Sequence, residues 1–389
     1  MSLPIPTPDR DRPASQLARL YLGVDRAAPD PRGRPPGLIV TLPPAWGNKY
    51  QILLYQEAAA HRMAVMGART PEDLDQISWP GPIVLHAHWF GPFFRTARDD
   101  SGARHLLRDV QDRLVAFRDR TGARLLWTAH NIYPHGNAFP QTFLDLRRWI
   151  FETFDALHVM QDAHVPVLET AFGRKAPPSF TVPHMSYAGI APDTISRLSA
   201  RAHLGIAERA TVFGFFGSLQ GYKNLPQFLR AVAPLAQAAP GRIAAVIGGV
   251  PSDPDTLRDI DATWGDAPWL RILPRDLPDH EIQYIHRASD VMVLPYETLN
   301  SGAALMAASY RTPVLMPDRT ATPELRGHGL LTYDARDPDG LHTALAAIAD
   351  RPPLPGQRLP AHLAPSAISH AFLRHVDGLM PAHKTGKTL

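Results

Sequence analysis

The sequence contains no cysteine, which excludes disulfide bonds and thiolate catalysis. It also lacks an uninterrupted apolar run of about 18 residues, the length at which a helix would cross a membrane. The first residues, MSLPIPTPDRDRPASQ, contain no apolar core, so we do not expect a secretory signal there. These absences fit a reducing compartment, and we expect the chain in the cytoplasm.

The composition is that of a globular protein long enough for two ordinary domains: of 389 residues, 44% are hydrophobic and 20% are charged. The net charge is only +3, but the sequence pI is about 9.2. This pI is compatible with anionic partners such as lipid headgroups or phosphates, and equally with an arginine-rich surface. We expect no nucleic-acid partner. Many of the 40 prolines cluster in residues 1–36, where we expect a poorly ordered arm, and in residues 351–365, where we expect a connector before a final short helix.

Short apolar runs alternate with amphipathic stretches along the chain. Strands are predicted at 38–42, 83–87, 124–128, 156–160 and 179–182, and helices at 50–65, 103–120, 140–153 and 163–172. The pattern then restarts, with strands predicted at 211–216, 243–248, 269–273, 290–294 and 312–316 and helices between them. Such an alternation predicts an α/β fold with doubly wound parallel sheets, in two Rossmann-like halves.

We therefore expect four parts: an N-terminal arm (1–36), a first Rossmann-like domain (37–190), a second one (191–365), and a C-terminal helix and tail (366–389). A cleft between the two domains would be a natural ligand site, because strand carboxyl ends from both sheets can face it.

The loop after the predicted strand 211–216 reads Gly-Ser-Leu-Gln-Gly-Tyr-Lys. Gly217 lets the backbone approach a ligand closely, and Lys223 adds a positive charge near the start of the next helix. These features favour a phosphate. When the loop is considered alone, a plain turn with a solvated lysine is the favoured explanation, and the Walker A pattern is absent.

A second bare helix start follows another strand of the same half, in LPYETLNSGAALMAASYRTPVL. Ser301 is suited to cap this helix, and Gly302 would leave backbone N–H groups open to an anion beside Asn300. The alternative is a serine cap on a buried helix, and both can hold at once. Together with Lys223, this helix start predicts a diphosphate site.

The two segments FFGSLQGYKN and LPYETLNSGAALMAASYRTPVL resemble the donor domain of GT-B glycosyltransferases, more narrowly bacterial exopolysaccharide transferases related to family 4 and to xanthan-type β-mannosyltransferases. In the first half, GNKYQILLYQEA, LHAHW, LLWTAHNIYPH and TVPHMSY resemble motifs of the same group in the same order. The resemblance covers roughly residues 37–350. It implies a GT-B fold in which the C-terminal half binds a nucleotide sugar and the N-terminal half binds the acceptor.

The sequence departs from the family 4 pattern in the donor half. Ser218 stands where that family commonly has an arginine. Thr298 and Met306 stand where it has two glutamates, although Glu297 is one residue from the first. The resemblance therefore implies that the sugar and ribose are held differently or more weakly here, and it leaves retaining chemistry open.

Histidines follow the strands of the first half. The resemblance places His130 near the sugar or the leaving phosphate, where a histidine could donate a hydrogen bond or move a proton. We expect His86 in the core, and we leave His88 and His184 open between structure and function. A metal site formed by His86 and His88 with His130, His158 and His184, as in barrel amidohydrolases, is the less favoured alternative.

The acceptor side is marked by Trp46, Asn48, Lys49 and Tyr50, in the loop after the first strand. An apolar stripe along the predicted helix 140–153 favours core packing, with docking on a membrane surface as the alternative.

The sequence thus predicts a metal-independent glycosyltransferase without a cofactor, active at the cytoplasmic face of the inner membrane. It would use a nucleoside diphosphate sugar, GDP-mannose by resemblance, and a lipid-linked saccharide in exopolysaccharide assembly. The expected catalytic residue is His130. The expected acceptor-binding residues are Asn48, Lys49, Tyr50 and His88, and the expected donor-binding residues are Gly217, Ser218, Lys223, Glu297, Asn300, Ser301 and Gly302. The alternatives are a UDP-sugar transferase of the same fold and a non-catalytic GT-B partner subunit.

Overall fold

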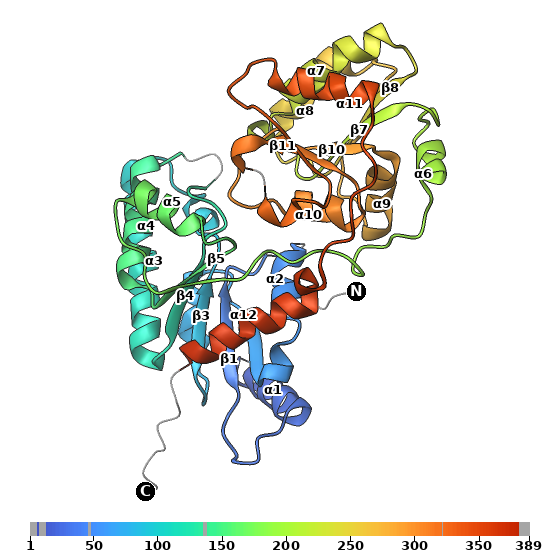
Figure 1. Cartoon of the computed structure of the whole chain (residues 1–389). Helices are drawn as coiled ribbons and strands as arrows, with labels where there is room; N and C mark the ends of the chain where they lie inside the picture. Colours follow the sequence, from blue (N-terminus) through green and yellow to red (C-terminus); the bar gives the residue numbers. More distant parts are fainter. Residues whose placement is uncertain (1–5, 8–12, 46–47, 135–137, 321, 381–389) are drawn as a thin grey trace, which may run out of the picture. The chain divides into compact units, whose positions relative to one another are not determined.

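The computed structural model describes residues 6–7, 13–45, 48–134, 138–320 and 322–380. The chain forms two compact units, which are coloured along the sequence in Figure 1. Unit 1 comprises Met1–Met185 together with Pro365–Leu389, and unit 2 comprises Ser186–Ala364. The C-terminal segment therefore returns to the first unit, so the units do not simply follow chain order.

Unit 1 is built on a six-stranded parallel sheet with the order β2-β1-β3-β4-β5-β6. Its strands are β1 (Gly37–Leu42), β2 (Met63–Gly67), β3 (Ile83–Ala87), β4 (Arg124–Thr128), β5 (Ala156–Val159) and β6 (Ser179–Thr181). The central strands are buried on both faces, which explains their nearly continuous apolar runs. The strands predicted in this half are confirmed, and β2 is an addition.

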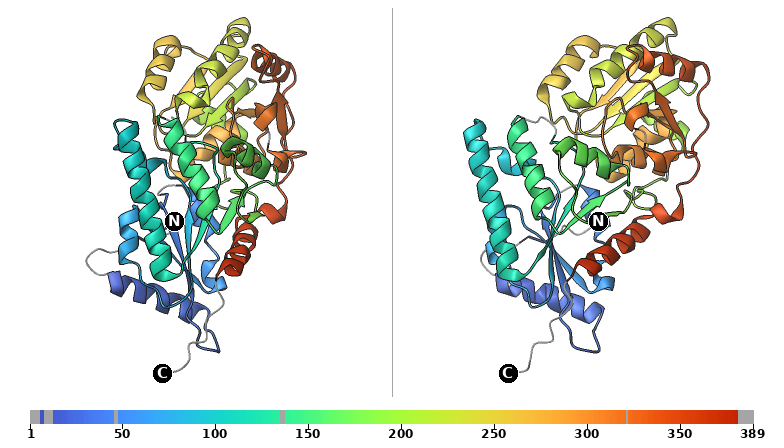
Figure 2. Two further views of the ribbon diagram at one scale, coloured as in Figure 1. Left: turned by 90° about the vertical axis from the view of Figure 1, so that its left-hand side faces the viewer. Right: turned by 60° about the vertical axis from the view of Figure 1, so that its left-hand side comes forward.

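Helices cover both faces of this sheet. On one face lie α3 (Asp100–Thr121), α4 (Pro140–Thr153) and α5 (His164–Phe172), while α12 (Pro365–Leu379) lies on the other, as Figures 1 and 2 show. α12 packs against α2 (Lys49–Leu54) and the 3-10 turn Ala58–His61. The predicted C-terminal helix thus completes the core of unit 1.

The prediction of one helix over residues 50–65 was wrong. That helix ends with α2, and the chain then passes through the short 3-10 turn to Arg62, which adopts a left-handed φ of 56°. The apolar run that follows becomes the edge strand β2, in which Met63 pairs with Gly37 of β1. The pairing of these backbones with a central strand outweighs the local helical pattern.

The expectation of a poorly ordered arm over residues 1–36 was also wrong in part, because α1 (Pro13–Ala27) forms within it. Leu17 and Val24 of α1 are buried. The segment that joins α1 to β1 is held by Arg62, whose Nη2 donates to the Arg34 carbonyl at 2.7 Å and pairs with Asp25 at 3.4 Å.

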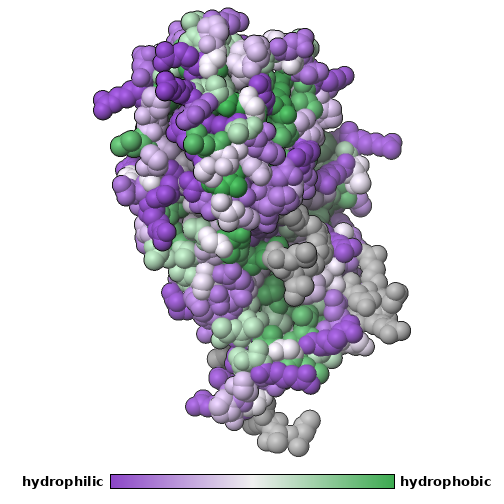
Figure 3. Space-filling model, turned by 90° about the vertical axis from the view of Figure 1, so that its right-hand side faces the viewer, coloured by the Kyte–Doolittle hydropathy of each residue, from purple (hydrophilic) through white to green (hydrophobic). Residues whose placement is uncertain are grey.

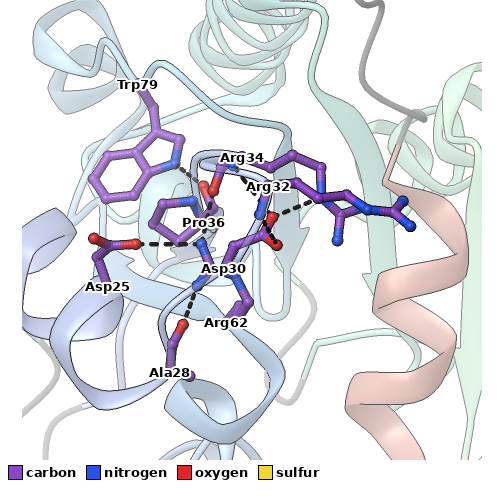
Figure 4. A network of polar contacts seen from close by, with 8 residues as sticks. All are labelled: Asp25, Ala28, Asp30, Arg32, Arg34, Pro36, Arg62 and Trp79. Carbon is purple, nitrogen blue, oxygen red and sulfur yellow. Dashed lines mark hydrogen bonds and ion pairs between the residues drawn. The ribbon is translucent and has the colours of Figure 1, made fainter.

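Figure 4 shows this network from close by. Arg62 Nη1 also donates to the carbonyl of Ala28, and Trp79 Nε1 donates to the carbonyl of Pro36 at 2.7 Å. Asp30 accepts from Arg34 Nε at 2.6 Å, and this bond together with those from the Arg32 and Arg34 backbones lowers the pKa of the Asp30 carboxyl to about 2. The proline-rich stretch is therefore fixed by side chains rather than by regular secondary structure.

Unit 2 carries a second six-stranded parallel sheet, with the order β12-β11-β10-β7-β8-β9. Its strands are β7 (Thr211–Phe216), β8 (Ile243–Gly248), β9 (Leu270–Leu273), β10 (Val291–Val293), β11 (Val314–Pro317) and β12 (Leu330–Tyr333). Its helices are α6 (Arg197–His203), α7 (Leu225–Ala238), α8 (Pro254–Trp264), α9 (Asp279–Ala288), α10 (Gly302–Ser309) and α11 (Gly340–Asp350). The restart of the pattern is confirmed, and β12 was not predicted.

Candidate functional site

The strand order of unit 2 brings two particular loops together. Counted along the chain its strands run 3-2-1-4-5-6, so the winding reverses between β7 and β10. Doubly wound sheets bind ligands outside the carboxyl ends of the strands at such a reversal. The loops that leave β7 and β10 here are residues 217–224 and 294–301, the two segments that the sequence marked.

Lys223 is held inside this site. Its side chain is buried, and its Nζ lies 4.9 Å from the ring centre of Tyr296 and 5.8 Å from that of Phe215. A Cβ on Gly217 would stand 3.0 Å from the same Nζ, so the ammonium lies against bare backbone. In the described part of the chain, no carboxylate oxygen approaches it within the 4.0 Å of an ion pair. A buried cation without a counterion is suited to an anionic ligand.

Asn224 joins the two loops. It adopts a left-handed φ of 54°, and its Nδ2 donates to the Pro295 carbonyl at 2.9 Å. The rings of Tyr222 and Tyr296 meet edge to face at 6.0 Å, and the hydroxyl of Tyr296 lies 3.5 Å from Ser301 Oγ. These contacts bring Lys223 and the start of α10 into one site.

α10 begins with the cap that the sequence predicted. Ser301 is buried, and its Oγ accepts from the Ala304 N–H at 3.2 Å. Gly302 is the first helical residue, and its N–H and that of Ala303 take part in no hydrogen bond among the residues that the structure describes. Asn300 adds a buried Nδ2 that also lacks a partner within the described ranges. Three donors thus remain for a ligand beside the buried lysine.

The other residues predicted to bind the nucleotide sugar lie around this centre. Ser218 Oγ donates to Ser252 Oγ at 3.0 Å, in the loop after β8. Glu297 is exposed. Burial of Tyr333 raises the pKa of its hydroxyl to about 12, and the negative charge of Glu297 contributes to this rise. Thr298 donates to the Asn300 carbonyl at 2.7 Å, and Met306 is buried in the core.

In unit 1 the strand order is 2-1-3-4-5-6, and the winding reverses between β1 and β3. Asn48 follows β1 and caps α2 through Oδ1, which accepts from the Tyr50 N–H at 2.9 Å. Lys49 is half-buried in the first turn of α2. The predicted contribution of Trp46 lies outside the described residues. The Tyr50 ring is buried, with its centre 5.1 Å from that of His130.

Four histidines behind Tyr50 form one continuous series of hydrogen bonds with two hydroxyls and a carbonyl. We call it the histidine chain; it runs from the Val182 carbonyl through His158, Thr128, His86, Tyr55 and His88 to His130. Its bonds measure between 2.6 and 3.0 Å. The series joins His88 to His130, and it places the buried His86 in the core, as expected.

Burial keeps the rings of the histidine chain neutral. It lowers the pKa of His158 to about 4 and holds those of His86, His88 and His130 well below their usual value. His184 lies beside the series with its ring 4.9 Å from that of Tyr50; its Nδ1 bonds to the Met185 carbonyl, and burial lowers its pKa to about 4.

The metal alternative finds no support in this geometry. Among the described residues, no group of three or more His, Asp or Glu side chains is placed to hold a metal ion. The rings of His86 and His158 are bridged by the Thr128 hydroxyl, and those of His86 and His88 by the Tyr55 hydroxyl, so they do not converge on one point.

Sequence reasoning missed Tyr55, Thr128 and Arg147. Arg147 is buried on α4: its Nε donates to the Ile132 carbonyl at 3.2 Å, and its guanidinium lies 4.6 Å from the Trp127 ring. Burial lowers the pKa of Arg147 to about 9, and its charge contributes to lowering that of His130. The one available signal was that polar residues alternate with apolar ones at the ends of adjacent strands, where Thr128 pairs with His158.

The apolar stripe of α4 belongs to the core, as the sequence favoured. Phe143, Leu146 and Ile150 are buried in unit 1. No helix in the described part of the chain has the length and apolar character to cross a membrane. The face drawn in Figure 3 intersperses hydrophilic and hydrophobic side chains.

Comparison with known proteins locates a family within unit 2: residues 210–351 match the family model described as glycosyl transferases group 1. D-inositol 3-phosphate glycosyltransferase of Saccharomonospora viridis is 30% identical over 258 residues, which cover 60% of this chain and 58% of that protein. The enzyme of the same name from Nocardia farcinica is 31% identical over 204 residues, which cover 48% and 43%. The chain thus spans less than two thirds of the length of these relatives.

Solved structures show the fold. Anabaena Alr3699/HepE in complex with UDP and glucose superposes with a TM-score of 0.59 at 14% identity, over 87% of this chain and 99% of that one. Trehalose-6-phosphate from E. coli bound with UDP-2-fluoro glucose gives a TM-score of 0.60 at 14% identity, over 89% and 99%. Structural neighbours of this kind are GT-B glycosyltransferases, and the two parallel six-stranded sheets of this chain have that fold.

Proposed function

We propose that the chain is a glycosyltransferase that moves a sugar from a nucleoside diphosphate sugar, held by unit 2, to a hydroxyl of an acceptor held by unit 1. The observation that carries this proposal is the buried ammonium of Lys223, which has no carboxylate partner among the described residues and lies at the winding reversal of a group 1 sheet. A diphosphate supplies the missing negative charge.

The donor-binding roles follow from position. Lys223 would pair with the diphosphate, while the N–H groups of Gly302 and Ala303 and the Nδ2 of Asn300 would donate to its oxygens. Negative charge grows on the diphosphate as the bond to the anomeric carbon breaks, so these groups would stabilise the transition state more than the ground state. Gly217, Ser218 and Glu297 stay as proposed contacts along the same edge.

In unit 1 the proposed base is His130, next to the buried ring of Tyr50. As the acceptor oxygen forms its bond to the anomeric carbon, His130 would take the proton of that hydroxyl, and the diphosphate would leave with the electron pair of the broken C–O bond. His88, Asn48, Lys49 and Tyr50 are the proposed acceptor side. This balance requires no metal or redox partner.

The donor and acceptor identities are finer proposals. UDP or a UDP-sugar is present in the similar structures named above, which favours a UDP-sugar over the GDP-mannose that the exopolysaccharide resemblance suggests. The relatives' name favours an inositol phosphate as acceptor over a lipid-linked saccharide. A lipid-linked acceptor would also require peripheral contact with a membrane.

The test is a matrix of four reactions: UDP-glucose or GDP-mannose with inositol 3-phosphate or a polyprenyl diphosphate-linked sugar, each with and without EDTA. Product formation is followed by mass spectrometry. We expect one pair of donor and acceptor to form product both without and with EDTA. Tight nucleotide binding without transfer or donor hydrolysis in any arm would support the non-catalytic partner subunit, in line with Ser218, Thr298 and Met306 at the family's arginine and glutamate positions. No binding of either nucleotide would contradict the proposal.

A further inference from the structure

The histidine chain has a direction, because one of its ends is a carbonyl. We propose that the Val182 carbonyl, acting through the histidine chain, fixes His130 in the tautomer with hydrogen on Nε2 and leaves its Nδ1 as a free base. The intermediate members are therefore positioning residues for His130. This inference deepens the proposed function, since the base so prepared is the one assigned there to the acceptor hydroxyl.

The assignment starts at Val182. A carbonyl only accepts hydrogen bonds, so His158 Nε2, 3.0 Å away, must carry hydrogen. In a neutral ring His158 Nδ1 is then an acceptor. The hydroxyl of Thr128, 2.9 Å from that Nδ1, must donate its single hydrogen to it.

The same logic continues through the middle of the series. Because the hydroxyl of Thr128 donates its hydrogen to His158, its oxygen accepts a hydrogen bond from His86 Nε2 at 2.6 Å. His86 Nδ1 then accepts, and Tyr55 donates to it at 2.7 Å. The oxygen of Tyr55 in turn accepts from His88 Nε2 at 2.8 Å. Each step allows one arrangement as long as the rings are neutral.

The last step reaches His130. His88 Nδ1 is left as an acceptor, so His130 Nε2, 2.9 Å away, must donate to it. Among the ring nitrogens of the histidine chain, only His130 Nδ1 has no role in the series, and it makes no hydrogen bond within the described ranges. His130 is also half-buried, whereas His86 and His88 are almost fully buried.

The surroundings of His130 support a neutral ring. The rings of Tyr50 and Trp89 lie 5.1 and 4.2 Å from its own. Burial lowers the pKa of His130 most, and the charge or potential charge of His88, His158, His184 and Arg147 lowers it further. No carboxylate is among those causes. The ring is thus ready to accept a proton at Nδ1, and its Nε2–H stays committed to His88.

The test reads tautomers by NMR. Long-range proton–nitrogen correlation spectra of the full chain with 15N-labelled histidine are recorded at pH 7, and His130 is assigned by its absence in His130→Gln. We expect wild-type His130 to be the pure Nε2–H tautomer. Thr128→Val removes the link to the carbonyl, after which the remaining series can run in either direction, so a large Nδ1–H fraction should appear at His130.

Two variants separate direction from packing. Thr128→Ser keeps the hydroxyl and should keep the wild-type tautomer. Thr142→Val deletes another buried threonine hydroxyl of unit 1, one that has no hydrogen-bond partner in the described structure, and should also leave His130 unchanged. If Thr128→Val does not fold, Tyr55→Phe cuts the series between His86 and His88 and should give the same mixture.

The turnover number should follow the fraction of His130 in the Nε2–H tautomer. A roughly equal mixture of tautomers should lower kcat about two-fold with KM unchanged. The inference is overturned if wild-type His130 carries hydrogen on Nδ1, or if both cutting variants leave the pure Nε2–H tautomer. The spectra need no turnover, so a chain that transfers no sugar would contradict the proposed function while still deciding the tautomer.

Discussion

Unit 1 and unit 2 share one sheet geometry, but they place different kinds of polar group at its carboxyl edge. The edge of unit 2 offers a buried ammonium and, at the start of α10, backbone N–H groups without a partner among the described residues. The edge of unit 1 offers neutral side chains that hydrogen-bond to one another from the end of β6 to the end of β3. The first arrangement suits a strongly charged ligand, and the second suits a hydroxyl whose proton is to be moved.

The largest expected difference between the units is their response to acid. The folded-state pKa of His158 and of His184 lies near 4, below the unfolded value of about 6.5. Below pH 6.5 the unfolded chain therefore binds protons that the folded chain excludes, and stability present above pH 6.5 is lost as pH falls towards 4. Each such group costs on the order of 3 kcal/mol at pH 4.

In unit 2 the matching case is His286, which is buried with a pKa lowered to about 3. Because unit 1 holds the whole histidine chain, we expect it to unfold first on acidification. Hydrogen exchange between pH 7 and pH 5, corrected for its intrinsic pH dependence, should show β3 and β4 losing protection before β7 and β8. Loss of protection in β7 and β8 before β3 and β4 would contradict this expectation.

The next largest effect concerns the backbone of the unit 2 site. Gly249 has a φ of 141°, and a Cβ there would stand 1.8 Å from the Gly217 carbonyl oxygen. Gly249→Ala should cost more than the roughly 1–3 kcal/mol of such a backbone conformation alone, because it also displaces the loop that carries Lys223. Differential scanning calorimetry measures the cost.

Gly241→Ala is the matched control for that loop. Its φ is 76°, and an added Cβ meets no atom within 4 Å. It should lower the melting temperature less than Gly249→Ala and leave nucleotide affinity intact. Equal effects of the two variants would mean that the contact between Gly249 and Gly217 has no special role.

Removing the charge of Lys223 should have a smaller effect on folding and a clear one on binding. Lys223→Met should weaken nucleoside diphosphate binding by about 1–3 kcal/mol, or roughly 5- to 150-fold, as for a hydrogen bond to a charged group. Titration calorimetry measures it. Lys175→Met, at a lysine whose side chain is 93% exposed, should change nothing. Unchanged affinity in Lys223→Met would remove the proposed diphosphate site.

The smallest structural change tests the start of α10. Gly302→Val should abolish transfer with little loss of melting temperature, because the first helical position tolerates a side chain at a cost below about 1 kcal/mol, whereas a bound phosphate does not. The variant is compared with wild type by calorimetry and by nucleotide titration. A large fall in melting temperature with affinity intact would show that this slender helix serves packing.

The two sites differ in how far the sequence predicts them. The unit 2 site lies in two continuous segments, so its loops and the Ser301 cap follow from local residue patterns. The histidine chain does not, since Tyr55 and His86 are 31 residues apart and His88 and His130 are 42 apart. The packing of α2 and the register of the parallel strands bring such partners together, and no local pattern encodes either.

The same reason explains the errors in the fold. Strands buried on both faces were predicted from their apolar runs. The edge strand β2 was read as the end of a helix, because its four apolar residues carry no period of their own. α1 was missed because prolines flank it, although Leu17 and Val24 give it a buried side.

The central claim is that unit 2 binds a nucleoside diphosphate through Lys223 and the start of α10. Hydrogen exchange of the full chain with saturating UDP, with GDP and without nucleotide tests it directly. The account predicts that one of the two nucleotides protects the backbone amides of residues 217–224 and 300–305, and that this protection is lost in Lys223→Met. The claim would be contradicted if both nucleotides, at saturating concentration, left both segments unprotected or protected only amides of unit 1.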